Sequence, residues 1–180
     1  MNQKGISLVE LIVAMAVAAV IGWIIVSAFT NLNRAVIDQN TVVDMQSTGR
    51  NAMATMVRIL RETGLDPLGT ADAGIEENTP TKLRITRDAN LNGLIDEGAQ
   101  ETVTFEFIPG PPGQPGTLRR CFDEGSAVET CSDMSADVQN LTFDYPDANT
   151  INITLTLQEE KADKQDFTRT LSTTVQGRNP

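Results

Sequence analysis

Residues 4–29 read KGISLVELIVAMAVAAVIGWIIVSAF, and this stretch decides how the rest of the chain is interpreted. After Lys4 and Gly5 it is apolar as far as Phe29, apart from small residues and one acid, Glu10. At about 1.5 Å per residue, a helix from Ile6 to Phe29 is roughly 36 Å long, enough to cross a hydrocarbon core of about 30 Å. A secretory signal peptide has a shorter apolar region, of about 7–15 residues, and a small-residue cleavage site that is not evident here.

Glu10 is the residue that an ordinary membrane anchor does not explain. A carboxylate inside a membrane-spanning segment costs several kcal/mol, so it is a functional candidate by default. The simpler alternative is a single-span anchor in which the acid reaches the membrane surface. That alternative accounts for the length of the apolar run but gives Glu10 no role.

The order of residues around Glu10 resembles the N-terminus of type IV prepilins and the related pseudopilins. In that family a dedicated peptidase cuts after a glycine, the new N-terminus is methylated, and the fifth mature residue is a glutamate. The resemblance implies cleavage after Gly5, Ile6 as the first mature residue and Glu10 as the fifth. Ile6 departs from the phenylalanine that is usual at the first mature position.

This resemblance also implies an assembly role for Glu10. Cleavage would create a positive amine at Ile6, one helical turn before Glu10. In a filament, the amine of a neighbouring subunit can lie beside Glu10, and the attraction between the charges offsets the cost of burying both. Glu10 would then fix the register of docked subunits.

The helical pattern continues well past the apolar run. Between Asn31 and about Glu62 no proline occurs, and Gly64 followed by Pro67 is a plausible stop. Apolar residues recur at spacings of three and four, the helical period, at Leu32, Ala35, Val36, Val43, Ala52, Met53, Met56, Val57 and Leu60. The sequence therefore predicts one helix of over fifty residues whose second half packs on a sheet. A coiled-coil stalk is the alternative.

The rest of the chain alternates apolar and polar residues in short runs. This period of two predicts strands, at 82–86, 102–108, 117–122, 138–145, 150–157 and 167–175. The last two strands read as a hairpin bridged by residues 158–166. The fold class is therefore α+β, a long N-terminal helix on an antiparallel sheet, which is also the layout of the pilin fold. The expected organisation is a cleaved leader at 1–5, a membrane or filament-core half of the helix at 6–29, an amphipathic half at 30–64 and a β-rich globular part at 65–180.

Composition narrows the function classes. The chain has a formal net charge of −10 and no histidine. An acidic chain is a poor nucleic-acid binder, since that binding rests on basic patches, and none is expected. Without histidine no Ser–His or Cys–His pair can form, so an enzyme is not expected. In an exported domain Cys121 and Cys131 would form one disulfide.

One segment has the spacing of a calcium loop. In DANLNGLIDE, residues 88–97, oxygen-bearing side chains occupy alternate positions as in the first half of an EF-hand loop. The predicted Ca²⁺ ligands are Asp88, Asn90, Asn92, the Leu94 carbonyl and Asp96. The twelfth position is Ala99 rather than glutamate, so another ligand must come from Glu97, Glu101 or a distant residue. The alternative is a polar hairpin loop around the Asn92-Gly93 turn.

Together these observations favour a structural subunit. Residues 118–120 and 138–145 resemble PilW-type minor pilins and J-type minor pseudopilins. The expectation is a minor type IV pilin that primes or caps a pilus, with prepilin peptidase, other pilin subunits and an inner-membrane assembly platform as partners. It would sit in the bacterial inner membrane with its globular part periplasmic, and then in the filament. The alternatives are a minor pseudopilin of a type II secretion system and, in a different class, a membrane-anchored periplasmic binding module.

Overall fold

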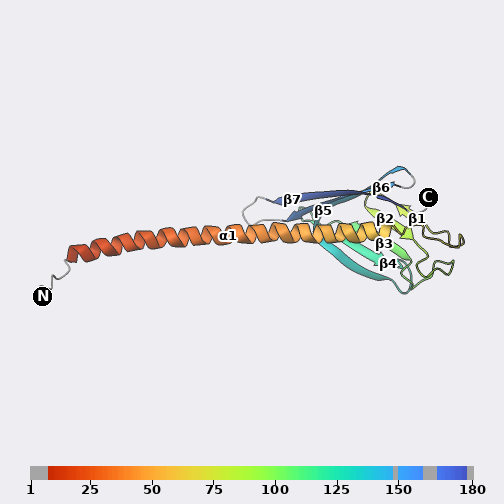
Figure 1. The fold of residues 1–180 in the computed structure, drawn as a ribbon, viewed down its shortest axis with the longest axis horizontal. Coiled ribbons are helices and arrows are strands. Elements are labelled where there is room, and N and C mark those ends of the chain that lie inside the picture. Colours follow the sequence, from red (N-terminus) through yellow and green to blue (C-terminus); the bar gives the residue numbers. More distant parts are fainter. Residues whose placement is uncertain (1–7, 148–149, 160–165, 178–180) are drawn as a thin grey trace. The chain divides into compact units, whose positions relative to one another are not determined.

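The computed structural model describes residues 8–147, 150–159 and 166–177. It contains one long helix followed by an antiparallel sheet of seven strands, which confirms the predicted α+β class (Figure 1). The elements are α1 (Leu8–Leu60), β1 (Ile75–Asn78), β2 (Lys82–Thr86), β3 (Thr102–Ile108), β4 (Gly116–Phe122), β5 (Thr130–Asp147), β6 (Thr150–Glu159) and β7 (Phe167–Gln176). The chain divides into two compact units, residues 1–43 and 44–180.

The first unit is the apolar part of α1. Among the described residues, α1 is the one helix with a stretch long and apolar enough to cross a membrane, and none of that stretch is buried within the chain. Leu32, Val36 and Val43 are also exposed, at 65%, 54% and 62%. The expectation that the packed stripe begins near Asn31 is therefore wrong, because the buried face of α1 begins only at Met45.

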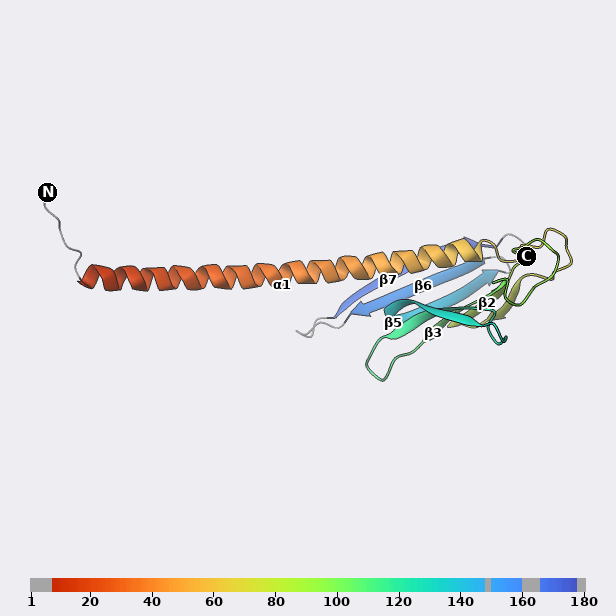
Figure 2. The same ribbon diagram turned by 90° about the horizontal axis from the view of Figure 1, so that it is seen from below.

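In the second unit, the last part of α1 lies along one face of the sheet (Figure 2). Its buried residues recur at spacings of three and four, the helical period, and are Met45, Gly49, Ala52, Met53, Met56, Ile59 and Leu60. They form one core with inward-facing residues of the strands, such as Leu83, Phe105, Leu141 and Leu155. Gly49 marks the closest approach, since a Cβ there would lie 2.5 Å from Leu157 Cδ1 and 2.9 Å from Leu171 Cδ1.

The helix ends near the predicted stop. After Leu60 a turn leads to Gly64, whose φ of +72° lies in the left-handed region that glycine adopts without strain. The Gly64 N–H donates to the Thr86 carbonyl at 3.2 Å, which ties the helix end to β2.

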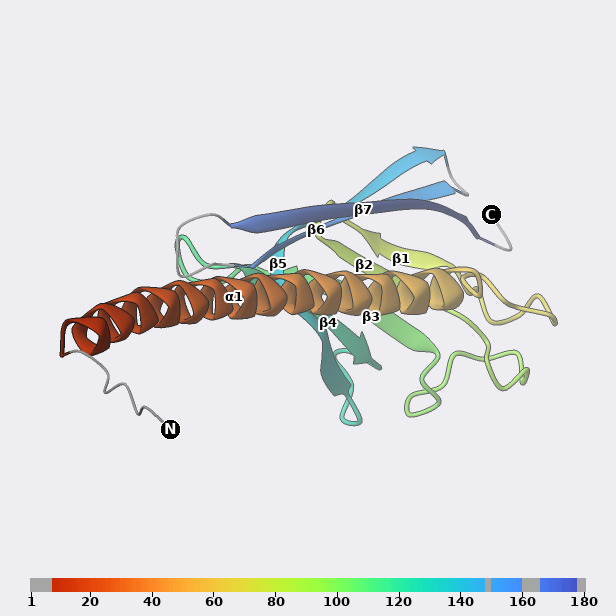
Figure 3. The same ribbon diagram turned by 60° about the vertical axis from the view of Figure 1, so that its left-hand side comes forward.

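The sheet is a meander in which spatial order follows chain order from β1 to β7. All six predicted strands are present, and two features were missed. β1 lies in a segment expected to be loop, and β5 begins at Thr130, eight residues before the predicted start. β5 pairs with β4 through its first half and with β6 through its second half, with register shifts near Val138 where the pairing changes (Figure 3).

The β6–β7 hairpin and the predicted disulfide both form. Glu159 pairs with Phe167 across the hairpin, while most of its connection, residues 160–165, lies outside the described residues. Cys121 and Cys131 occupy directly paired positions on β4 and β5, and their sulfurs are bonded. The disulfide thus joins the strand pair that carries the unpredicted first half of β5.

The close approach at Gly49 predicts a graded response to substitution. Ile at this position adds branches that Leu157 and Leu171 must accommodate, so Gly49→Ile should destabilise the fold by about 1–3 kcal/mol. Gly49→Ala should change stability little, because higher helix propensity, worth about 1 kcal/mol, offsets the contact. Urea unfolding measures both. Asn51→Ile, at an exposed position of α1, is the control, and an equal loss there would contradict the packing argument.

Tyr145, the single tyrosine, gives a second prediction. Burial raises its pKa to about 12, and its hydroxyl has no hydrogen-bond partner. Absorbance at 295 nm should therefore titrate near pH 12 in the folded protein and near pH 10 in urea. The stability linked to this group is fully present below pH 10 and is lost as pH rises toward 12. Tyr145→Phe should be neutral or stabilising by about 1 kcal/mol at pH 7, because it removes an unsatisfied buried group. A folded-state midpoint near 10 would show that the ring is not buried.

Candidate functional site

The first candidate site is the N-terminal segment. Gly5 and Ile6, the predicted processing residues, lie outside the described residues. Glu10, the predicted assembly residue, lies in the first turn of α1 and is exposed. An acid in the first turn interacts favourably with the helix dipole. The apolar residues that follow it are exposed as well, so the segment presents one acid at the start of the apolar part of α1.

The second candidate site lies at one end of the sheet, where three connections meet. These are residues 61–74 after α1, 87–101 between β2 and β3, and 123–129 between β4 and β5, and together they are called the loop end. The Asp88 N–H donates to the Leu65 carbonyl at 2.8 Å, which links the first two connections. The Gly98 N–H donates to Asp123 Oδ2 at 3.1 Å, which links the second and third.

Asp88 is the buried anchor of the predicted calcium loop. Its side chain is fully buried, and its two oxygens accept the N–H groups of Asn92 at 3.1 Å and Gly93 at 2.8 Å. Gly93 has a φ of +84°, and a Cβ there would lie 2.4 Å from Thr70 Oγ1. The Asn92-Gly93 turn therefore needs glycine both for its conformation and for the approach of the 61–74 connection.

Asn90, Asn92 and Asp96 converge at the surface of the same loop. The amide groups of Asn90 and Asn92 donate to Asp96 Oδ2 at 3.1 and 2.5 Å. Their amide oxygens accept the N–H groups of Asn92 and Leu94. The structure thus brings three of the predicted ligands together, with Asp88 on the buried side and the Leu94 side chain exposed.

Glu101 organises this loop. Its side chain is fully buried, Oε1 accepts the N–H groups of Ala89 at 2.9 Å and Asn90 at 3.0 Å, and Oε2 accepts that of Asp96 at 2.7 Å. The sequence named Glu101 only as one possible further ligand, because its place after the Ala99 position does not reveal that it lies beneath the loop.

Glu124, next to Asp123, is held in an ion pair. Lys82 Nζ lies 3.0 Å from Glu124 Oε1, and the Thr104 hydroxyl donates to Oε2 at 2.7 Å. Burial acts to raise the pKa of Glu124, but the hydrogen bonds from Thr104 and Lys82 outweigh it and hold the pKa below its ordinary value. The hydrogen bond to Glu124 raises the pKa of Lys82 in turn. These two charges compensate each other.

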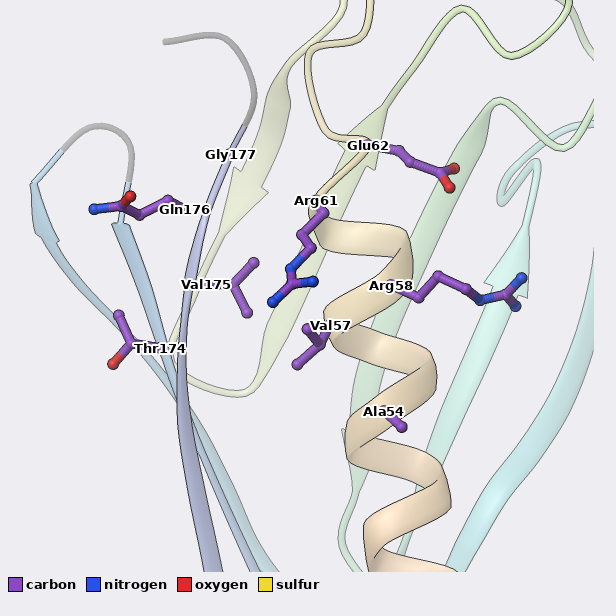
Figure 4. A pocket seen from close by; sticks show the side chains of 9 residues that line it. All are labelled: Ala54, Val57, Arg58, Arg61, Glu62, Thr174, Val175, Gln176 and Gly177. Carbon is purple, nitrogen blue, oxygen red and sulfur yellow. The ribbon is translucent and has the colours of Figure 1, made fainter.

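A groove of about 990 Å³ lies between the last turns of α1 and β7 (Figure 4). Val57 and Val175 face one another across it with Arg61 beside them, whereas Arg58 and Glu62 point to the other side of the helix. The one hydroxyl group in its lining, that of Thr174, donates to Asn152 Oδ1 at 2.8 Å. The groove combines apolar side chains with a cation and holds no pair of a nucleophile and a base.

Comparison with known families decides the interpretation of the first site. Residues 1–26 match the model of the prokaryotic N-terminal methylation motif. This match supports the resemblance of the N-terminus to those of type IV pilin-like precursors. The motif covers the short leader, Gly5, Glu10 and most of the apolar run, and the helix-on-sheet architecture agrees with it. No curated protein and no solved structure matches the chain. With this motif at its start, α1 fits a membrane anchor.

The role of Glu101 can be tested by removing its carboxylate. Glu101→Ala leaves three backbone N–H groups without their acceptor, and we expect a loss of at least about 2 kcal/mol in the free energy of unfolding. Urea denaturation measures this loss. Glu106→Ala, five residues further along in β3, is the matched control and should cost less than about 1 kcal/mol. Equal costs at the two positions would show that Glu101 does not hold the loop together.

Proposed function

We propose that this protein is a minor type IV pilin, a structural subunit that primes or caps a pilus filament after cleavage behind Gly5. The observation that carries the proposal is the methylation motif at residues 1–26, continued by an exposed apolar helix with Glu10 in its first turn. A catalytic role is not part of the proposal. The partners are prepilin peptidase, other pilin subunits and the inner-membrane assembly platform.

The exposed apolar part of α1 supports assembly into a helical core. No residue between Leu8 and Phe29 is buried within the chain, so this surface is available to lipid first and to neighbouring subunits afterwards. Neighbouring helices offer no stronger apolar contact than lipid does, so a polar interaction must favour the assembled state. The pairing of Glu10 with the Ile6 amine of a neighbour supplies it.

Two features favour a minor subunit over a major one. Residues 8–60 contain no proline, whereas major pilins commonly carry one in the membrane half of the helix. The globular part is also relatively large, with seven strands. A minor pseudopilin of a type II secretion system is the second candidate, since it has the same N-terminus and the same layout. In either case the subunit begins in the bacterial inner membrane with its globular part in the periplasm.

The first experiment is the intact mass of the protein after coexpression with a prepilin peptidase. We expect loss of Met1–Gly5, with a methyl group added at Ile6. Glu10→Ala should leave cleavage intact but remove the protein from sheared filaments. Ser7→Ala is the control inside the same segment and should be both cleaved and assembled. An unprocessed chain would contradict the proposal and leave a membrane-anchored periplasmic binding module as the better description.

A further inference from the structure

Five acids in and beside the predicted calcium loop have no basic partner within 4.0 Å. They are Asp88, Asp96, Glu97, Glu101 and Asp123. Within the described part of the chain, none of them lies within 4.0 Å of a lysine or arginine nitrogen, and three bases of this region are each paired with other acids. The pairs are Lys82 with Glu77 and Glu124, Arg84 with Glu76, and Arg87 with Glu62. The loop end therefore carries more acids than bases, an excess of negative charge.

Three of these acids are withdrawn from water. Asp88 and Glu101 are fully buried and Asp123 is 5% exposed. A buried charge is costly unless it is paired or bound to a metal ion. Backbone N–H groups satisfy both oxygens of Asp88 and of Glu101. Asp123 differs, because Oδ2 accepts the Gly98 N–H while the buried Oδ1 has no hydrogen-bond partner in the structure.

Asp123 lies against a cavity of about 210 Å³ between the 87–101 connection and the turn after β4. Asp96 and Glu97 line the same cavity, and so does Ser126. A volume of this size holds an ion together with several waters, since one water occupies about 30 Å³ of liquid. Asp96 belongs both to this cavity and to the calcium loop, because its Oδ2 accepts hydrogen bonds from the side-chain amides of Asn90 and Asn92.

We propose that the loop end binds a calcium ion at Asp96, and that Asp123 supplies the carboxylate that the 88–99 loop lacks. On the loop side the donors are the amide oxygens of Asn90 and Asn92, each of which keeps a second lone pair for a cation. On the cavity side they are the carboxylates of Glu97 and Asp123. Asp88 and Glu101 hold the backbone in place beneath the ion and add to its electrostatic attraction.

The chemistry of the donors selects the metal. All of them are oxygens, which suits a hard divalent cation rather than zinc or copper. Calcium accepts six to eight oxygens in flexible geometry, whereas magnesium demands a near-ideal octahedron and keeps several waters. The donors here come from two separate connections, an arrangement that suits the flexible geometry of calcium better than the strict octahedron of magnesium.

The acids are spread apart in the structure. Among the described residues, the carboxylates of the loop end do not form a group of three with oxygens within 4.8 Å of one another. Like charges without a cation between them repel, so binding must draw Glu97 and Asp123 toward Asp96. The ion would therefore fasten the 123–129 connection to the 87–101 connection, and the resistance of both to proteolysis should rise with calcium.

The test is calorimetric titration of the chelator-treated full chain in detergent with calcium chloride, together with thermal unfolding. We expect one ion per chain, with a dissociation constant of about 10⁻⁴–10⁻³ M as in extracellular modules, and a rise of several degrees in Tm at about 5 mM calcium. Asp123→Asn should weaken binding at least about tenfold. In chelator its Tm should equal or exceed that of the wild type, because the substitution removes an unsatisfied buried charge and keeps an acceptor for Gly98.

Asp144→Asn, at an exposed position in the second half of β5, removes the same charge and should retain the calcium response. Absence of binding to the wild type at 10 mM calcium would overturn the proposal. A calcium response in Asp123→Asn equal to that of the wild type would also overturn it. The loop would then bind calcium without Asp123, and that residue would have a purely structural role. The calcium measurement does not depend on processing after Gly5. The calcium proposal can therefore fail while the pilin proposal holds, and the pilin proposal can fail while the calcium proposal holds.

Discussion

The burial of one face of α1, from Met45 to Leu60, against the antiparallel sheet is the interaction on which the globular part depends. It favours a small helix residue at Gly49, where Leu157 and Leu171 approach most closely. It also fixes where the helix must end, because Gly64 reaches the Thr86 carbonyl directly after the last buried turn. From that point the 61–74 connection runs beside the 87–101 connection, so the geometry of the loop end follows from the packing of the helix.

Features that depend on local pattern were predictable from the sequence, and those that depend on tertiary pairing were not. The alternation in 150–157 and the apolar spacing after Ala52 reflect burial of one face, so β6 and the packed part of α1 were found. Thr130–Asp137 is mostly polar and mostly exposed, and it is a strand because the disulfide and the β4 backbone hold it there. β1 has only four residues, three of them exposed, so its sequence carries no periodic signal.

The same distinction applies to the loop end. The alternate spacing of Asp88, Asn90 and Asn92 is a sequence pattern, and the structure places these residues around one turn. Asp123 lies 35 positions after Asp88, and only the antiparallel pairing of β3 with β4 brings it to the same end of the sheet. Glu101 was named without its role, since nothing in the sequence tells a carboxylate beneath a loop from one at its surface. Acids that act from below a site are recognised by burial and by the backbone groups that they accept.

The meander order of the sheet has a consequence for how the domain is made. Each strand pairs with the one that precedes it in the chain, so nearly all the strand contacts are local and the contact order of the sheet is low. A domain of this kind can build its sheet strand by strand as the chain is synthesised. β7 is added last and completes the sheet against β6, which leaves its outer edge as the final surface to form.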